Sequence, residues 1–206
     1  MEFYLDGLER SGNVYLSYAI SLSTGINLNS LRTHNIETLK NYKGSDPFIV
    51  PVRDALESIS SARVFRKYVF DNKMFNDMGG TESELDNIVR RYKEYTDYLV
   101  KNEKFFIAPF HEFTKDHMLV INKMIKFYSN LYDIKIIDFL NKEDIFLKIE
   151  KQHKDQYSHH PQLGNFPRED NEEKYQIREL LLKQYRDDTE HIQSNINLLY
   201  KRYEAI

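Results

Sequence analysis

The 206-residue sequence contains no cysteine, and glycine and proline are scarce, with seven and five copies. The lack of cysteine excludes disulfides, thiolate metal sites and cysteine nucleophiles, and it is compatible with a cytoplasmic protein. The chain has no flexible linker, internal repeat or low-complexity tract. No run approaches 18 apolar residues, so we expect no membrane-spanning helix. The acidic first ten residues lack the layout of a signal peptide.

Charge of either sign is not in large excess. The chain has 29 basic and 32 acidic residues, for a formal net charge of −3. This balance excludes a strongly basic nucleic-acid binder, although it leaves room for a local basic patch. Hydrophobic residues make up 41% and charged residues 30%, which is typical of a globular protein. We expect a single domain, 1–206, with a core large enough to be stable without disulfides or structural metals.

Apolar and aromatic residues recur at helical spacing near the start of the chain. The residues spaced by three and four are Tyr4, Leu8, Ser11, Tyr15, Tyr18 and Leu22. This pattern predicts a first helix over about 2–23. A shorter helix follows and ends at Gly44, which fits a C-cap. The next helix is expected over about 47–70, with a proline in its first turn and Ser45 or Asp46 as its N-cap.

Further along the chain, Thr81 and Glu84 form a capping box that opens another helix. Its apolar stripe is Leu85, Ile88, Tyr92, Tyr95 and Leu99. The sequence FFIAPF at 105–110 fits either a strand or a buried turn. Helical spacing returns over 118–132 and 143–152, and a polar loop at 157–170 precedes a final helix over about 171–203. The sequence therefore predicts an all-α bundle of about six or seven helices.

The predicted final helix carries two distinct lines of residues. One broad face is apolar and should be core: Ile177, Leu181, Tyr185, Ile192, Ile196, Leu199 and Tyr203. Beside it runs a polar line of Gln184, Asp188, His191 and Asn195. Buried polar groups must be hydrogen-bonded, so this line faces a partner's polar groups or a wet cleft, or it is a solvated shoulder of the helix.

Arg186 and His191 supply chemistry suited to cutting RNA. A histidine can take the proton of a ribose 2′-OH or return one to the leaving oxygen. A guanidinium can hold a phosphate and its developing charge through paired hydrogen bonds. No metal is needed when the nucleophile is the substrate's own hydroxyl. Ideal helix geometry separates the two side chains by about 140°, so a second copy of the helix would supply the missing group.

The sequence Arg186-Asp187-Asp188-Thr189-Glu190-His191 has the form R-x4-6-H, and LNSLRTHNIETLKNY at 28–42 is similar to a THxLxxL segment. Both features resemble the HEPN superfamily. The resemblance implies a helical bundle that dimerises through its motif helices. It also implies a metal-independent endoribonuclease of a toxin, abortive-infection or phage-defence system, without a cofactor. His191 would be the general acid/base, Arg186 the phosphate ligand and Asp187 an orienting group.

We expect a homodimer that joins two copies of the C-terminal helix, because one chain offers no evident partners for the polar line. Its residues Gln184, Asp188 and Asn195 would bind the RNA substrate, and an antitoxin protein would be a further partner of a toxin. The alternative is a non-catalytic helical adaptor that binds a protein or nucleotide ligand on the polar line.

Two histidine-rich stretches offer other chemistry. His153, His159 and His160 could hold zinc or nickel in a metal-dependent hydrolase, although a solvated loop is favoured. His111, Glu112, Asp116 and His117 do not reproduce H-E-x-x-H, because the second histidine comes two residues too late. We expect surface or capping roles for them.

Overall fold

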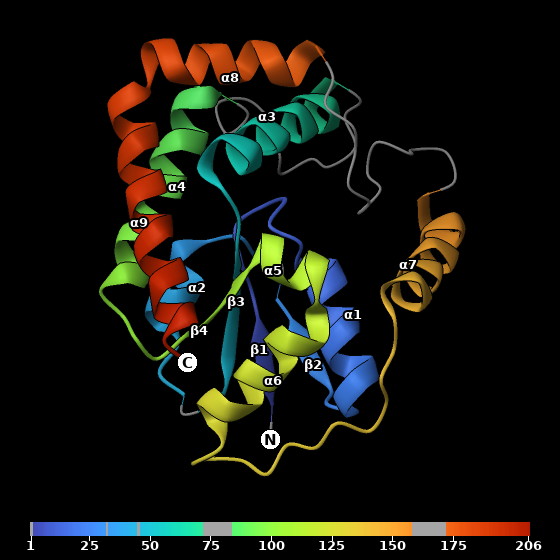
Figure 1. The fold of residues 1–206 in the computed structure, drawn as a ribbon. Coiled ribbons are helices and arrows are strands. Elements are labelled where there is room, and N and C mark those ends of the chain that lie inside the picture. The colour runs from blue at the N-terminus through green and yellow to red at the C-terminus, as the bar shows by residue number, and fades with distance from the viewer. Residues whose placement is uncertain (1, 32, 45, 72–83, 158–171) are drawn as a thin grey trace.

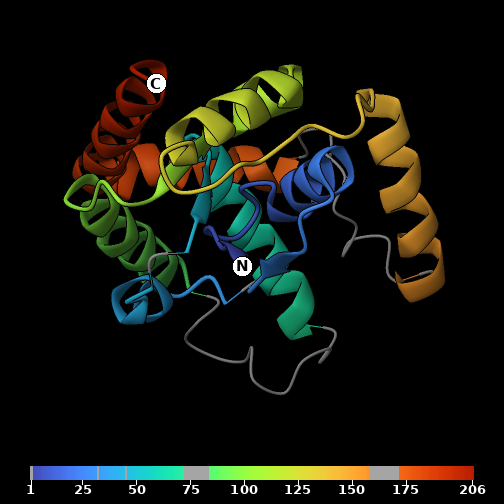
Figure 2. The same cartoon turned by 90° about the horizontal axis from the view of Figure 1, so that it is seen from below.

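The computed structural model describes residues 2–31, 33–44, 46–71, 84–157 and 172–206. In this part of the chain, a four-stranded parallel sheet lies between two groups of helices (Figures 1 and 2). The protein therefore has an α/β fold, and the all-α HEPN-like bundle predicted from the sequence is wrong.

Short strands alternate with helices in the first half of the chain, and helices dominate the second half. The first elements are β1 (Phe3–Leu5), α1 (Asn13–Thr24), β2 (Leu28–Ser30), α2 (Ile36–Asn41), β3 (Phe48–Val52) and α3 (Ala55–Asp71). The remaining ones are α4 (Leu85–Val100), β4 (Phe106–Pro109), α5 (Phe110–Lys115), α6 (His117–Tyr128), α7 (Lys142–Tyr157), α8 (Glu172–Gln184) and α9 (Arg186–Glu204).

The strands lie in the order β2-β1-β3-β4, and every neighbouring pair is parallel. Ile49 in β3 sits opposite Leu5 of β1 on one side and Phe106 of β4 on the other. Because the strands are parallel, their carboxyl ends share one edge of the sheet, on the side where α3 begins (Figure 1). The connections after β1, β3 and β4 therefore meet at this edge.

Each face of the sheet has its own hydrophobic core. Phe48, Val50 and Ile107 pack with residues of α2, α3, α4, α8 and α9. Phe3, Leu5 and Phe106 pack with residues of α1, α5, α6 and α7 on the opposite face. The sequences of strands buried on both faces are continuous apolar runs, so they lack the alternation of apolar and polar residues that identifies a half-buried strand.

The predicted first helix is wrong over its first half. Phe3 and Leu5 are fully buried in β1, and residues 6–12 form a loop before α1. A strand of three residues is too short to display a period of two, so the helical spacing that begins at Tyr4 arose by coincidence. The expected helix over 47–70 is wrong in its first part for a similar reason, because Phe48–Val52 form the buried strand β3. The remainder is confirmed by α3.

Other sequence predictions are confirmed. The ambiguous FFIAPF sequence contains β4. The stripe on α4 is buried at Ile88, Tyr92, Tyr95 and Leu99. The predicted capping box is wrong at Glu84, which is the N-cap residue of α4 and makes no side-chain capping hydrogen bond. Thr81 lies outside the described residues. No described helix is both long and apolar enough to cross a bilayer.

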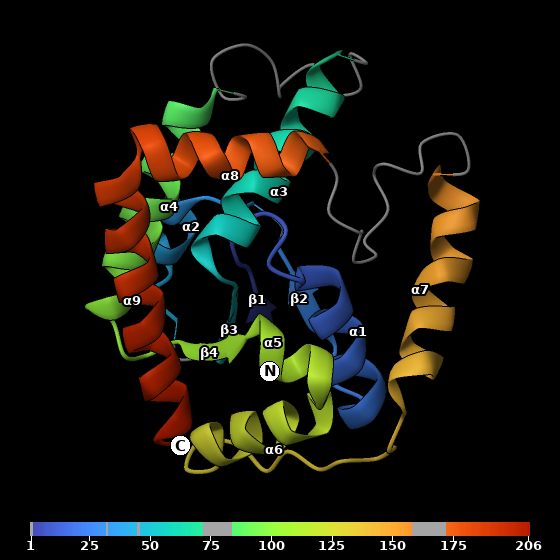
Figure 3. The ribbon, with the colours of Figure 1, turned by 45° about the horizontal axis from the view of Figure 1, so that its top comes forward.

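The predicted final helix is two helices, because the backbone leaves helical geometry at Tyr185, with φ −124° and ψ 27°. Figure 3 shows α8 and α9 meeting at an angle at this point. The predicted core face is nevertheless confirmed on both helices. Its fully or almost fully buried members are Ile177, Leu181, Ile192, Ile196, Leu199 and Tyr203.

We expect Ile192→Ala to lower the free energy of unfolding by about 2–5 kcal/mol, because this fully buried side chain would leave a cavity. Leu198→Ala on the same helix is the matched control. Its side chain is 49% exposed, so a change within about 0.5 kcal/mol is expected. Urea unfolding followed by circular dichroism measures both. Equal losses in the two variants would show that α9 does not pack as described.

Candidate functional site

The order of the strands places a topological switch point between β1 and β3. From β1 the chain moves to β2 on one side, and it then crosses to β3 on the other side. In open α/β sheets, ligands bind outside the carboxyl ends of the strands at such a point. The loop at 6–12, after β1, and Arg53 and Asp54, after β3, flank this position.

The loop at 6–12 is held in a backbone conformation that its sequence allows. Arg10 and Gly12 have φ values of 61° and 89°, both in the left-handed region. A Cβ atom on Gly12 would also lie 2.6 Å from the Phe113 ring. A Cβ on Gly7 would lie 2.7 Å from the carbonyl oxygen of Pro51 in β3. The two glycines are therefore required by backbone geometry and by close packing.

This loop ends at the uncapped N-terminus of α1. Gly12 is the N-cap residue, and no side chain caps the helix. The first backbone bond into the helix runs from the Leu16 amide to the Gly12 carbonyl at 3.1 Å. Asn13 is 7% exposed, and its Oδ1 has no hydrogen-bond partner in the described structure. An uncapped helix N-terminus after a glycine-containing loop is a binding position for phosphate, because amide groups and the helix dipole both favour an anion.

Two arginines add positive charge beside the loop. Arg10 lies in it, and the guanidinium of Arg53 donates to the Arg10 carbonyl oxygen at 3.2 Å. Arg53 also stacks over the Phe110 ring, 4.4 Å from its centroid, and bonds Glu57 at 3.2 Å. Arg53 is thus fixed in place by three contacts. Arginine is well suited to paired hydrogen bonds with phosphate oxygens.

His34 lies on the other side of the loop. Its Nδ1 is 2.6 Å from the carbonyl oxygen of Gly7 and 3.7 Å from Oδ1 of Asp6. A carbonyl oxygen can only accept, so Nδ1 carries the proton and Nε2 remains a base. His34 has a φ of 52°, which is rare for a residue other than glycine and is often found at functional sites.

Glu9, one of the two acidic residues of the loop, is neutralised within the protein. Glu9 is 5% exposed, and it accepts from Nε of Arg66 at 2.6 Å, with Arg91 3.7 Å away. Burial alone would raise the pKa of Glu9, but the hydrogen bond and charge of Arg66 outweigh it, so the pKa is lowered. His34 and Arg91 contribute to this lowering. Glu9 therefore anchors the loop to α3 without cancelling the positive charge offered to an anion.

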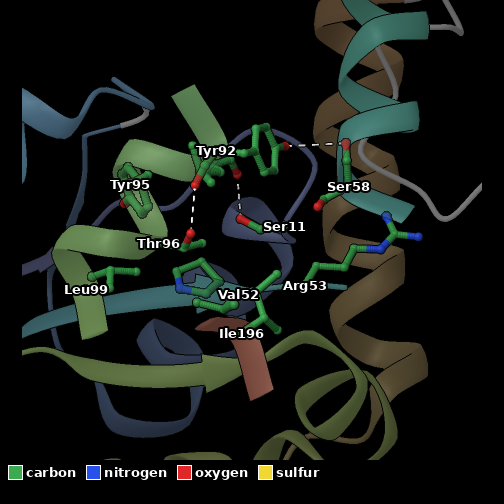
Figure 4. Close-up of a pocket in the computed structure, with 11 residues that line it drawn as sticks. Ser11, Val52, Arg53, Ser58, Tyr92, Tyr95, Thr96, Leu99 and Ile196 are labelled. Atoms are coloured by element: carbon green, nitrogen blue, oxygen red, sulfur yellow. Dashed lines mark hydrogen bonds between the residues drawn. The ribbon is translucent and has the colours of Figure 1, made fainter. Parts of the chain in front are cut away.

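Figure 4 shows a small cavity beneath the loop, bordered by Ser11, Arg53 and Tyr95. It has room for about one water molecule, so it cannot hold a nucleotide. The Tyr92 hydroxyl donates to the Glu9 carbonyl at 2.7 Å, and the Ser11 hydroxyl donates to the Leu8 carbonyl at 2.5 Å. α4 and the loop's own hydroxyl thus stiffen the loop, and a ligand would bind at the outer rim.

The residues predicted to cut RNA all lie on α9, far from this loop in sequence. Arg186 begins α9, is exposed, and donates to the Leu182 carbonyl at 3.3 Å. Asp187 is exposed in the same first turn. His191 is also exposed, and its Nε2 is 2.7 Å from Oδ1 of Asp97. Arg186 and His191 therefore have different partners in the single chain.

The polar line of α8 and α9 is largely satisfied by α4. Asp188 pairs with Lys93 at 2.5 Å, and Asn195 donates to Asp97 at 2.7 Å. Partial burial of Asp97 acts to raise its pKa. The hydrogen bonds with His191 and Asn195 outweigh this effect, so the pKa of Asp97 is lowered. Gln184 is exposed at the end of α8. These contacts remove the reason given for a homodimer, and the dimer itself stays a prediction.

The other histidine-rich stretches are placed only in part. Asp116 caps α6 by accepting from the Leu119 amide at 3.1 Å, which confirms a capping role. His117 is buried rather than on the surface, and its Nε2 is 2.9 Å from the Leu140 carbonyl. His159 and His160 lie outside the described residues. Within the described residues, no three acidic or histidine side chains group as metal ligands.

The sequence analysis missed Gly7, Arg10, Gly12, His34 and Arg53. A signal was present, because Gly7 and Gly12 have the spacing of the glycines in G-x-x-x-x-G-K-[ST]. Asn13 and Val14 stand where that motif has lysine and a hydroxyl residue, so the motif is incomplete. The THxLxxL-like segment does not form one helix, since it spans β2, the loop with His34, and α2.

Comparisons of the chain with protein-family models, with curated proteins and with solved structures found no match. The site must therefore be interpreted from its own geometry. That geometry consists of a glycine-containing loop before the uncapped N-terminus of α1 at the switch point of a parallel sheet, two nearby arginines, and a histidine beside the loop.

Proposed function

We propose that the protein binds a nucleotide at the loop 6–12 and transfers an anionic group from it to an acceptor hydroxyl. The observation that carries the proposal is the uncapped N-terminus of α1, which follows the loop at the switch point. Arg53 contacts the loop on one side and His34 on the other. Arg53, which can bind an anion, and His34, which can accept a proton, thus contact the same loop.

A sulfuryl group fits this loop better than a phosphoryl group. In the G-x-x-x-x-G-K-[ST] loop, lysine reaches the terminal phosphates and the hydroxyl holds Mg²⁺. Asn13 and Val14 occupy those two positions here, and the Ser11 hydroxyl is used within the loop. A sulfuryl group carries less negative charge than a terminal phosphoryl group, so its transfer needs less neutralisation by a metal ion. We therefore propose a nucleotide phosphosulfate as the donor.

In the proposed reaction, the acceptor oxygen forms a bond to sulfur. The bond between sulfur and the bridging oxygen breaks, and its electron pair stays on the nucleotide phosphate. The acceptor's proton passes to Nε2 of His34. Arg10, Arg53 and the amide groups at the start of α1 stabilise the charge that develops on the phosphate.

Isothermal titration with adenosine 3′,5′-bisphosphate, the compound left when a 3′-phosphorylated adenosine 5′-phosphosulfate loses its sulfuryl group, tests the binding step. We expect the parent protein to bind it and Arg53→Ala to weaken binding by about tenfold or more, since a charge-assisted hydrogen bond is lost. Arg90→Ala is the matched control, because Arg90 is exposed on α4 and pairs with Glu94. A parent protein that binds neither this compound nor ATP with Mg²⁺ would contradict the proposal. Unchanged affinity in Arg53→Ala would remove Arg53 from the site.

The ribonuclease and adaptor functions proposed from the C-terminal helix remain predictions. The α/β fold differs from the helical bundle that the HEPN resemblance implied, so that resemblance no longer supports them. Residue contacts alone do not test cleavage of RNA. The matched histidine variants described in the Discussion separate the two activities.

A further inference from the structure

Asp6 is a buried carboxylate at the end of β1 that the proposed binding and transfer steps do not use. It is fully buried. Its carboxylate accepts a hydrogen bond from the Thr33 hydroxyl and another from the His34 amide at 3.2 Å. Its backbone amide donates to Ile49 in β3 at 3.2 Å. The carboxylate is therefore fixed by the sheet on one side and is directed at residues 33 and 34 on the other.

The contacts of Asp6 orient His34. The hydrogen bond from the His34 backbone amide to the Asp6 carboxylate holds His34 in its left-handed backbone conformation. The Gly7 carbonyl oxygen accepts a hydrogen bond from the imidazole. Oδ1 of Asp6 lies 3.7 Å from Nδ1 of His34. Only Nε2 of the ring is then left to receive a proton. An anion at this distance favours the charged imidazole that proton transfer creates.

Other charged groups face the same region and do not replace Asp6. Arg91 of α4 donates to the His34 carbonyl at 2.7 Å, and Glu9 of the loop is paired with Arg66 of α3. The pKa of Asp6 is raised overall, because burial outweighs the Thr33 hydroxyl and the charge of His34, which lower it. The hydrogen bonds from Thr33 and from the His34 amide favour the charged form of the carboxylate, which is the form that would act as a fixed negative charge.

We propose that Asp6 is a positioning residue that holds His34 in place through its backbone amide and stabilises the imidazolium formed when His34 takes the acceptor's proton. The inference rests on the proposed transfer function. Asp6 itself touches neither donor nor acceptor in this scheme. Its removal should therefore weaken proton transfer much more than it weakens binding of the bisphosphate.

Asp6→Asn, which keeps the shape and removes the charge, tests this role. We expect kcat to fall by about tenfold or more, and the acid limb of the pH profile to move to lower pH by about one unit, because a neighbouring charge commonly changes proton affinity by this amount. Thr33→Val is the control. It removes one hydrogen bond and keeps the carboxylate, so the acid limb should stay in place.

A second measurement does not depend on transfer. Proton NMR of the His34 ring follows the pH at which half of the imidazole is charged, and this midpoint should fall in Asp6→Asn. If the parent protein neither binds the bisphosphate nor transfers a sulfuryl group, the proposed function fails, whatever the NMR result. An unchanged midpoint in a folded Asp6→Asn protein overturns the role of Asp6. If near-UV circular dichroism shows that Asp6→Asn does not fold, Asp6→Ser takes its place with the same two outcomes.

Discussion

Replacing His34 with glutamine is expected to lower the rate of sulfuryl transfer by at least about a hundredfold, the usual effect of losing a general base. Glutamine can keep a hydrogen bond to the Gly7 carbonyl, which His34 contacts at 2.6 Å. It cannot accept a full proton from the acceptor. Binding of adenosine 3′,5′-bisphosphate should stay within about twofold of the parent value, because phosphate binding is assigned to the loop and Arg53.

His191→Gln provides the matched control, since His191 also has a carboxylate neighbour, at 2.7 Å, but lies on α9. We expect this variant to transfer sulfuryl groups at the parent rate. Cleavage of single-stranded RNA in EDTA, measured on the same three proteins, tests the ribonuclease prediction in parallel. Loss of RNA cleavage in His191→Gln alone would support the site on α9. Transfer that survives in His34→Gln would remove the assigned base.

The sequence predicted long amphipathic helices well and short buried strands badly. α4 and α9 each have one apolar face, so their residues recur every three or four positions and the buried stripes could be identified. β1 and β3 are buried on both faces and have only three and five residues. Nothing in such runs distinguishes a strand from a helix. Because β1 and β3 were missed together with β2, an α/β fold was predicted to be a helical bundle.

The candidate site was missed because its residues come from three separate connections. Gly7 and Gly12 belong to the connection after β1, His34 to the one after β2, and Arg53 to the one after β3. Only the parallel order of the strands brings these connections to the same edge. Without the strands, the paired glycines lay inside the helix predicted over 2–23, and Arg53 lay inside the helix predicted over 47–70. The polar line on α9 was recognised, but its intramolecular partners on α4 could not be predicted from spacing.

The buried ion pair between Arg66 and Glu9 is expected to be important for the stability of the loop and of the whole fold. Arg66 is 3% exposed and Glu9 5%. Arg66→Leu would leave the carboxylate buried without its hydrogen-bonded partner, with Arg91 still 3.7 Å away. Removing one partner of a buried pair typically costs about 3–5 kcal/mol, because the remaining charge has lost its compensation. We expect a loss of this size at pH 7, measured by urea unfolding.

Lys67→Met is the matched control, because Lys67 is the next residue of α3 and forms an exposed ion pair with Glu173. A change of no more than about 1 kcal/mol is expected there.

The pH dependence of stability gives a second test. In the parent protein the pKa of Glu9 is lowered, so its stabilising contribution is present above its unfolded-state pKa and is lost as the pH falls through the folded-state value.

In Arg66→Leu the contribution of Glu9 to stability has the opposite pH dependence, because burial without Arg66 favours the protonated carboxyl group. The difference in stability between parent and variant should therefore shrink as the pH is lowered from 7 towards about 4.5, near the usual range for glutamate. A difference that stays constant over this interval would show that Arg66 acts through packing of its side chain. The charge of Glu9 would then not be what fixes the loop beside the N-terminus of α1.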